Sequence, residues 1–230
     1  MSNSSKFKGE YEGSFYDEDY FENGKASGKG WLENYRWMPH RSHKEAGGFI
    51  NCLGLDKDSY VLDFGCAKGF LVRAFNELAI RADGCDISDY ALSFASGNCW
   101  NCSTEKAWKD HYDCGYTHIV SKDVFEHLTP DQLDNLLQKF LKVADVLMCA
   151  VPIGDSGKYR IAEYHQEISH IIIEDEDWWS RRFLKNGWKI IKDYEHVPGI
   201  KDNWQSFANG KGNHVFVLVQ SKQPPLEESQ

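Results

Sequence analysis

The fold of this chain is decided by the stretch VLDFGCAKGF at residues 61–70. Its first half is an apolar run around one acid, Asp63, and such a run is typical of a central strand in a parallel sheet. Its second half places small residues at 65, 67 and 69, so the backbone can turn tightly and approach a ligand before a helix begins near residue 70. A second acid, Asp86, follows the next apolar run. A glycine-rich turn between two such acids predicts a site for a cofactor that contains adenosine.

Strand and helix patterns alternate through the rest of the chain. Apolar runs predict strands at residues 60–64, 80–87, 98–102, 117–121, 146–151, 188–194 and 213–221. Helical spacing and end signals predict helices at residues 31–52, 70–78, 89–96, 129–143 and 177–186. Residues 11–24 are aromatic and acidic without a periodic pattern, and residues 153–173 are irregular. The alternation predicts an α/β sheet with helices on both faces.

The composition limits the class of protein. The hydrophobic share of 41% and the aromatic share of 14% are sufficient for a packed core. A formal net charge of −9 without a basic run disfavours DNA or RNA as a partner. No apolar stretch approaches the ~20 residues that span a bilayer, and the first ten residues lack the apolar segment of a secretory signal. The seven scattered cysteines are an odd number, which indicates reduced thiols and a cytoplasmic location. The oligomeric state stays open.

The spacing of the glycine-rich turn restricts the cofactor. A dinucleotide site needs G-x-G-x-x-G, but this turn reads Gly65-x-Ala67-x-Gly69 with Phe70 next. A phosphate-binding Walker loop is also absent, because no Lys-Ser or Lys-Thr pair follows the glycines. Asp86, at the tip of the second predicted strand, suits bidentate bonding to two ribose hydroxyls. The pattern favours a ligand with a ribose and without a pyrophosphate.

Three motifs occur in order: VLDFGCAKG at residues 61–69, CDIS at residues 85–88 and SKDVFEHL at residues 121–128. With these motifs, the chain resembles the class I S-adenosylmethionine-dependent methyltransferases over about residues 55–221. The resemblance implies a Rossmann-like fold, with a seven-stranded, mostly parallel sheet, helices on both faces and an antiparallel final hairpin. It implies S-adenosylmethionine (SAM) as the cofactor. Residues 16–24 also look like an arm of sugar- and polysaccharide-associated members.

The resemblance also implies roles for individual residues around the cofactor. The methionine part would lie against the turn and the end of the fourth strand, where the implied residues are Asp63, Gly65, Cys66, Ala67, Gly69, Lys122 and Asp123. The ribose and adenine would contact the ends of the second and third strands, where the implied residues are Asp86, Ile87, Cys102 and Ser103. Ala67 replaces the family's middle glycine, a substitution that the turn tolerates if φ stays negative.

Two histidines are candidates for catalysis. Transfer of a methyl group to an alcohol requires removal of the alcohol's proton, so a histidine or carboxylate base helps. His127 follows the fourth predicted strand, near the expected position of the methyl group, and His170 lies in the irregular stretch that should line the acceptor site. His165 lies in the same stretch. A capping or packing role is the alternative for each of them.

Two sets of potential metal ligands occur in the sequence. Cys99, Cys102, His111 and Cys114 offer the donors of a zinc site, but two side chains three apart on a strand point to opposite faces. His165, Glu167 and His170 could hold a divalent ion, although most short clusters of this kind are coincidental. We therefore expect no bound metal.

The sequence as a whole predicts three parts and one function. The parts are an N-terminal arm with a lid or helix at residues 1–54, a SAM-binding methyltransferase domain at residues 55–222 and a flexible tail at residues 223–230. The predicted function is transfer of a methyl group from SAM to a small-molecule or sugar-like acceptor at oxygen. The alternatives are a SAM-binding module without turnover, such as a pseudoenzyme partner, and a protein-directed methyltransferase.

Overall fold

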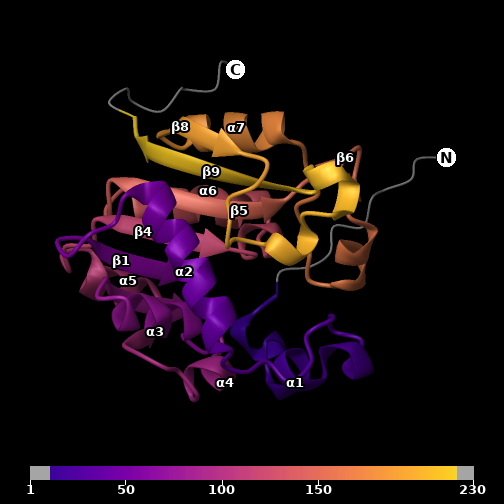
Figure 1. Cartoon of the computed structure of the whole chain (residues 1–230), viewed down its shortest axis with the longest axis horizontal. Coiled ribbons are helices and arrows are strands. Elements are labelled where there is room, and N and C mark those ends of the chain that lie inside the picture. The colour runs from indigo at the N-terminus through magenta and orange to yellow at the C-terminus, as the bar shows by residue number, and fades with distance from the viewer. Residues whose placement is uncertain (1–10, 222–230) are drawn as a thin grey trace.

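A computed structural model describes residues 11–221, which fold around a seven-stranded sheet in the order β3-β2-β1-β4-β5-β9-β8 (Figure 1). The strands are β1 (Tyr60–Phe64), β2 (Arg81–Asp86), β3 (Cys99–Asn101), β4 (His118–Lys122), β5 (Val146–Pro152), β8 (Trp188–Tyr194) and β9 (Asn213–Gln220). β1 to β5 run parallel, whereas β9 pairs antiparallel with both β5 and β8. The predicted sheet and its antiparallel final hairpin are therefore confirmed.

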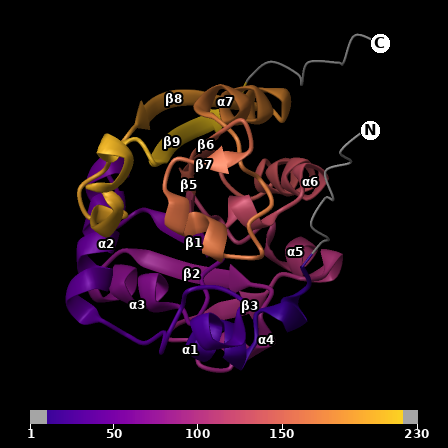
Figure 2. The ribbon, with the colours of Figure 1, turned by 90° about the vertical axis from the view of Figure 1, so that its right-hand side faces the viewer.

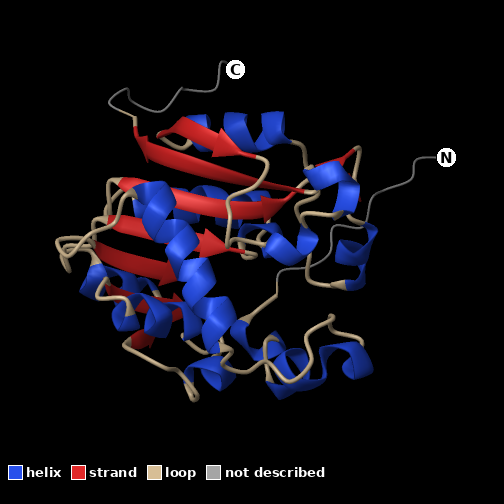
Figure 3. Cartoon of the chain, in the orientation of Figure 1, coloured by secondary structure: helices blue, strands red, loops and turns tan. Residues whose placement is uncertain are grey.

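Helices cover both faces of this sheet (Figures 2 and 3). The α-helices are α1 (Glu18–Ser27), α2 (Pro39–Leu53), α3 (Phe70–Glu77), α4 (Asp89–Leu92), α5 (Glu105–His111), α6 (Pro130–Phe140) and α7 (Glu176–Lys185). Alternate residues of the buried strand β1 face opposite layers. Val61 packs in the cluster that includes Phe49 of α2 and Phe75 of α3, and Leu62 packs in the cluster that includes Phe140 of α6. Burial on both faces explains why β1 is apolar along its length.

The remaining short elements are η1 (Gly13–Phe15), η2 (Phe125–His127), β6 (Gly154–Asp155), β7 (Lys158–Tyr159), η3 (Ala162–Gln166), η4 (Asp202–Trp204) and η5 (Phe207–Gly210). No helix within residues 11–221 combines the length and apolar character needed to cross a membrane. The predicted tail at residues 223–230 lies outside the described residues.

Two segments lie beyond the carboxyl ends of the parallel strands, on the right-hand side of Figure 1. One is the N-terminal segment 11–38, which includes α1, and the other is the segment 153–173 that follows β5. They touch, because the Tyr11 hydroxyl donates to the Ile168 carbonyl at 2.9 Å and the Ile168 N–H donates to the Lys29 carbonyl at 3.4 Å. Together they cover the edge of the sheet where the site residues were predicted.

The predicted structure of the N-terminal segment was wrong in two places. The helix predicted from residue 31 begins at Pro39, since proline lacks an N–H group and fits the first turn of a helix. The aromatic stretch predicted to lack a period contains α1, which begins after Asp17, whose carboxylate accepts from the Tyr20 N–H at 3.1 Å. Capping by Asp17 and the left-handed Gly28 define this helix more than its apolar spacing does.

Three smaller predictions also needed correction. The helix predicted at residues 89–96 ends at Leu92, and Ser88 rather than Asp89 caps it. Helix α5 was missed, because its seven residues carry little apolar pattern besides the buried Trp108. The small β6–β7 hairpin was missed within the irregular stretch 153–173.

The glycine-rich turn after β1 is left-handed at three positions. Gly65 has φ of 79°, Ala67 has φ of 48° and Gly69 has φ of 68°. A Cβ atom on Gly65 would lie 2.2 Å from Cγ2 of Val124, so this position has no room for a side chain. The condition of a negative φ, under which the turn was expected to tolerate Ala67, is therefore not met. An alanine in this conformation costs about 1–2 kcal/mol relative to an unstrained one.

We predict opposite effects on stability for two substitutions in this turn, one that introduces a glycine and one that removes a glycine. Ala67→Gly should raise the free energy of unfolding by on the order of 1 kcal/mol, because glycine removes the left-handed strain. Gly65→Ala should lower it by about 2 kcal/mol or more, because it adds both strain and a clash. Urea denaturation of the two variants and the parent measures both effects. A destabilised Ala67→Gly protein would contradict the left-handed turn.

Candidate functional site

A cavity of about 580 Å³ lies at the carboxyl ends of β1, β2 and β4. The sheet side of its wall includes Asp63, Gly65, Cys66, Ala67, Asp86, Ile87, Cys102, Lys122, Asp123, Glu126, His127 and His170. Its cover includes Tyr16, Tyr20, Trp31, Tyr35, Arg36, Tyr164 and Glu167 from the segments 11–38 and 153–173. The volume lies within the roughly 300–1,000 Å³ that small-molecule sites occupy.

Hydrogen bonds to β2 hold the glycine-rich turn at one end of this cavity. The N–H groups of Gly65 and Cys66 both donate to the Cys85 carbonyl, at 2.8 and 3.0 Å. The Ala67 N–H donates to Oδ2 of Asp86 at 2.8 Å. The turn is thus fixed against the end of the neighbouring strand, with its backbone exposed to the cavity.

Asp86 keeps acceptor capacity for a ligand. It accepts from the N–H groups of Ala67 and Ser88, at 2.8 and 2.9 Å. A carboxylate offers about four acceptor sites, so about two remain. Burial raises the pKa of Asp86, which makes further hydrogen-bond donors to the carboxylate favourable. Ile87 and Cys102 line the cavity beside it.

A buried network of charges lies between the turn and β4. Lys122 pairs with Glu45 of α2 at 3.1 Å and with Asp123 at 3.0 Å, and Asp123 also pairs with Lys201. Burial alone would raise the pKa of Asp123, but Lys201 and Lys122 outweigh it and hold the pKa well below its usual value. Asp63 is different, since burial and the nearby Glu45 raise its pKa to about 8 despite Lys122.

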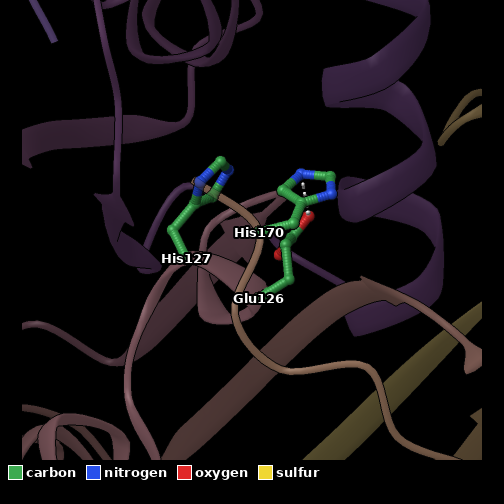
Figure 4. Close-up of side chains that lie close together, drawn as sticks. All are labelled: Glu126, His127 and His170. Carbon is green, nitrogen blue, oxygen red and sulfur yellow. Dashed lines mark ion pairs between the residues drawn. The ribbon is translucent and has the colours of Figure 1, made fainter. Parts of the chain in front are cut away.

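Glu126, His127 and His170 lie close together (Figure 4), and all three line the cavity. The first two belong to η2, after β4, and His170 comes from the segment after β5. The rings of the two histidines contact edge to face, with centroids 4.7 Å apart. Burial lowers the pKa of His127 to about 4 and lowers that of His170 well below its usual value. Both imidazoles are therefore neutral near pH 7.

The carboxyl group of Glu126 is also deeply buried. Burial first, and then the charge of Asp123, raise the pKa of Glu126 to about 8. Its backbone carbonyl accepts from the N–H groups of Ile171 and Ile172, at 2.7 and 3.0 Å, which holds the segment after β5 against η2. This pairing places His170 next to Glu126.

A second polar chain orients His127. Its Nδ1 lies 2.8 Å from the Ser169 hydroxyl, and that hydroxyl donates to Oε1 of Glu167 at 3.0 Å. Because the single proton of Ser169 goes to Glu167, its oxygen accepts from Nδ1–H of His127. Nε2 of His127 therefore carries the ring's lone pair.

The N-terminal cover is attached directly to the glycine-rich turn. Lys68, within the turn, pairs with Glu22 of α1 and donates to the Tyr35 carbonyl at 3.0 Å. The Ser88 hydroxyl donates to the Tyr16 carbonyl. These contacts couple the cover to the turn.

The structure brings together eleven of the thirteen predicted site residues and separates two. Gly69 begins α3 and faces Ser96 and Cys99 rather than the cavity. Ser103 does not line the cavity, and its N–H donates to the Asn101 side chain at 2.8 Å. Gly69 thus positions the helix, and Ser103 belongs to the turn after β3.

Within the described residues, neither of the two sets of potential metal ligands weighed from the sequence comes together as a cluster. Cys99 packs in the cluster on one face of the sheet and Cys102 in the cluster on the other, and His111 stacks on Trp100 with centroids 3.8 Å apart. Nε2 of His165 accepts from the Tyr159 N–H at 3.0 Å, which gives His165 a structural contact.

Sequence reasoning missed Glu45, Glu126 and Lys201 as parts of the site. Glu126 belongs to the motif SKDVFEHL at residues 121–128. An acid and a histidine side by side within an apolar segment could have indicated that both belong to the site. Glu45 and Lys201 reach the site from α2 and from the segment before β9, and nothing in the local sequence indicates this.

Solved structures of similar fold are numerous. A methyltransferase in complex with the Haloferax volcanii Trm112 methyltransferase activator is 14% identical, with 79% of this chain and 91% of that chain covered and a TM-score of 0.58. A SAM-dependent methyltransferase from Archaeoglobus fulgidus is 15% identical, with 76% and 92% covered and a TM-score of 0.56. Burkholderia thailandensis 1,6-didemethyltoxoflavin-N1-methyltransferase, with 1,6-didemethyltoxoflavin and S-adenosylhomocysteine bound, is 13% identical, with 80% of each chain covered and a TM-score of 0.55.

No family model and no curated protein matches the sequence. At these identities the likeness to solved structures concerns the fold. The chain has the class I methyltransferase fold.

We predict that Asp63 makes stability depend on pH. Its pKa is about 8 in the fold, against about 3.9 for an unperturbed aspartate, so the folded state keeps a proton that the unfolded state loses between these values. The free energy of unfolding should therefore fall as pH rises from about 4 to about 8. Asp63→Asn should make the decrease in the free energy of unfolding between pH 5.5 and pH 8 smaller by about 2–3 kcal/mol. Urea denaturation at the two pH values measures it.

The matched control for this test is Asp58→Asn, in the loop before β1, where the side chain is exposed. It should leave the dependence of stability on pH close to that of the parent. Equal slopes in the parent and in Asp63→Asn would show that Asp63 does not hold a proton in the folded state.

Proposed function

We propose that this protein is a SAM-dependent methyltransferase that transfers the methyl group to a small-molecule or sugar-like acceptor at oxygen. The observation that carries the proposal is a single cavity with two chemically different groups in its wall. The glycine-rich turn and Asp86 form one group, and two neutral histidines form the other. Both groups lie at the carboxyl edge of the sheet, which is where open α/β sheets bind ligands.

The proposed position of the cofactor follows from the hydrogen-bonding groups of the glycine-rich turn and Asp86. The free acceptor sites of Asp86 suit the two ribose hydroxyls, and Ile87 offers an apolar surface to the adenine. The methionine part of SAM carries a sulfonium and an ammonium group, and it would lie between the turn and the end of β4. Asp63 and Asp123 line that region, and a cation bound there would favour the ionised form of Asp63. The S-adenosylhomocysteine in the Burkholderia thailandensis structure supports this choice of cofactor.

The proposed reaction is an in-line displacement at the methyl carbon. An electron pair of the acceptor oxygen forms the new C–O bond while the C–S bond breaks, and the electron pair of that bond goes to sulfur. The products are the methylated acceptor and S-adenosylhomocysteine. The proton of the hydroxyl must leave, and the lone pair on Nε2 of His127 lies at the end of the cavity where it could accept that proton. The rest of the protein's contribution is alignment of oxygen, methyl and sulfur.

The cover of the cavity supports a small acceptor. Aromatic side chains of Tyr16, Trp31, Tyr35 and Tyr164 line it, and they suit an aromatic ring or the apolar face of a sugar. A protein acceptor would need the covering segments 11–38 and 153–173 to move apart. The seven free cysteines fit a reducing compartment, and we include a cytoplasmic location in the proposal.

We predict that Asp86→Asn weakens SAM binding. The substitution keeps the volume but removes the charge that would accept from the ribose, so the dissociation constant should rise about 10- to 100-fold. Asp89→Asn is the matched control, because Asp89 is exposed in α4 and does not line the cavity. Equilibrium dialysis with SAM measures both. Unchanged binding in Asp86→Asn would remove Asp86 from the ribose site.

We also predict that His127→Ala separates turnover from binding. Turnover should fall by about 10²–10⁴-fold with a methyl acceptor found by screening sugars and metabolites. The reason is that the variant has no base to remove the proton from the hydroxyl of that substrate. The dissociation constant for SAM should change little. His118→Ala, at the opposite end of β4, should behave like the parent. Turnover by His127→Ala equal to that of the parent would exclude His127 from the reaction.

A further inference from the structure

We propose that Glu126, His127 and His170, in the wall of the cavity, bind one divalent transition-metal ion, such as Zn²⁺ or Co²⁺. One ligand atom from each residue lies within 4.8 Å of the other two. Figure 4 shows the three side chains converging from η2 and from the segment after β5. This set shares only His170 with the sets weighed from the sequence, because Glu126 and His127 replace Glu167 and His165.

The strongest indication is an oxygen of Glu126. The side chain is 1% exposed, and its Oε2 has no hydrogen-bond partner within residues 11–221 although the residue lines the cavity. Its Oε1 lies 3.9 Å from Nε2 of His170, which is longer than a hydrogen bond. A buried carboxyl oxygen without a partner is costly unless a ligand completes its environment. A cation bound between Glu126 and the histidines would complete it.

The hydrogen bonds of His127 leave the correct nitrogen for a metal. Nδ1 donates to Ser169, which in turn donates to Glu167, so the lone pair lies on Nε2. Histidines that bind metals commonly use one ring nitrogen for the ion and donate the other N–H to a polar partner that fixes the ring. The Ser169–Glu167 pair performs this orienting role here, so Ser169 is a positioning residue of the proposed site.

The local charge can accommodate a cation. The titratable groups facing this part of the cavity are the carboxyl groups of Asp123, Glu126 and Glu167 and the ammonium groups of Lys122 and Lys201. Lys122 and Lys201 both pair with Asp123. A divalent ion bound beside the histidines would favour the ionised form of the Glu126 carboxyl.

The donor set indicates the class of ion. Two imidazoles and one carboxylate suit Zn²⁺, Co²⁺, Mn²⁺ or Fe²⁺, whereas Mg²⁺ and Ca²⁺ prefer oxygen ligands. Metal–ligand bonds of about 2.1 Å hold adjacent donors about 3–3.5 Å apart, so the donor atoms need to move together by about 1 Å. Three protein ligands would leave at least one position of the ion open toward the cavity.

The role of the ion rests on the proposed function, but its binding does not. An acceptor oxygen at the open position would be stabilised in its ionised form by the positive charge. Nε2 of His127 would then hold the ion, and the proton of the acceptor would leave to water. The ion would thus take over the part assigned to His127 as a base.

Binding of metal can be measured without any acceptor. The full chain, without a polyhistidine tag, is treated with EDTA, dialysed and titrated with Zn²⁺ by calorimetry and with Co²⁺ by visible absorption. We expect one equivalent of each to bind the parent. Glu126→Gln and His170→Ala should each weaken binding by about tenfold or more, and Ser169→Ala by about tenfold. His40→Ala, which removes an exposed histidine of α2, should bind as the parent does.

SAM binding in the presence of EDTA separates this proposal from the proposed function. A parent that binds SAM but takes up less than a tenth of an equivalent of Zn²⁺ and Co²⁺ would overturn the metal site alone. Metal binding that is unchanged in Glu126→Gln, or weakened as much in His40→Ala as in His170→Ala, would also overturn it. Glu126→Gln keeps the size and shape of the side chain, and a melting temperature near that of the parent confirms that the variant is folded.

Discussion

The hydrogen bond from the Ala67 N–H to the Asp86 carboxylate is the interaction on which the rest of the site depends. It joins the turn after β1 to the tip of β2, and two further N–H groups of the turn reach the Cys85 carbonyl. The turn can make these bonds only in a left-handed conformation, which Ala67 adopts at a cost. Local strain of this kind persists where the surrounding structure holds it, and it is concentrated at functional sites. Here it holds an acceptor group and exposed backbone at the mouth of one cavity.

The charges of the cavity are the second constraint. The residues Asp63, Glu45, Asp123 and Glu126 are acids gathered at one edge of the sheet, with Lys122 and Lys201 as their buried partners. Burial and the neighbouring acids raise the pKa values of Asp63 and Glu126 to about 8. Burying more acidic groups than basic partners costs stability, and such groups are commonest where a ligand uses them. The proposed cofactor is cationic at its reacting end and the proposed metal ion is a cation, and either cation would favour the ionised form of these carboxyl groups.

Much of the fold could be predicted because it is encoded locally. Apolar runs gave all seven strands of the sheet, and the spacing of residues 61–70 placed the turn. The N-terminal segment could not be predicted in this way, since α1 is fixed by its caps and by the surface that it covers. Tertiary packing also explains why Gly69 and Ser103 lie outside the cavity. Gly69 faces Ser96 and Cys99 of a neighbouring segment, and Ser103 completes its own turn. Glu45 and Lys201 meet Lys122 and Asp123 only through tertiary packing, so no local pattern reveals them.

The account requires that the turn binds a ribose-containing cation and not a pyrophosphate. Calorimetric titration of the full chain with SAM, S-adenosylhomocysteine, NAD⁺ and ATP tests this requirement directly. The account predicts saturable binding of one equivalent of SAM and one of S-adenosylhomocysteine, and no binding of NAD⁺ or ATP at the same concentrations. Binding of NAD⁺ or ATP without binding of SAM or S-adenosylhomocysteine would contradict it.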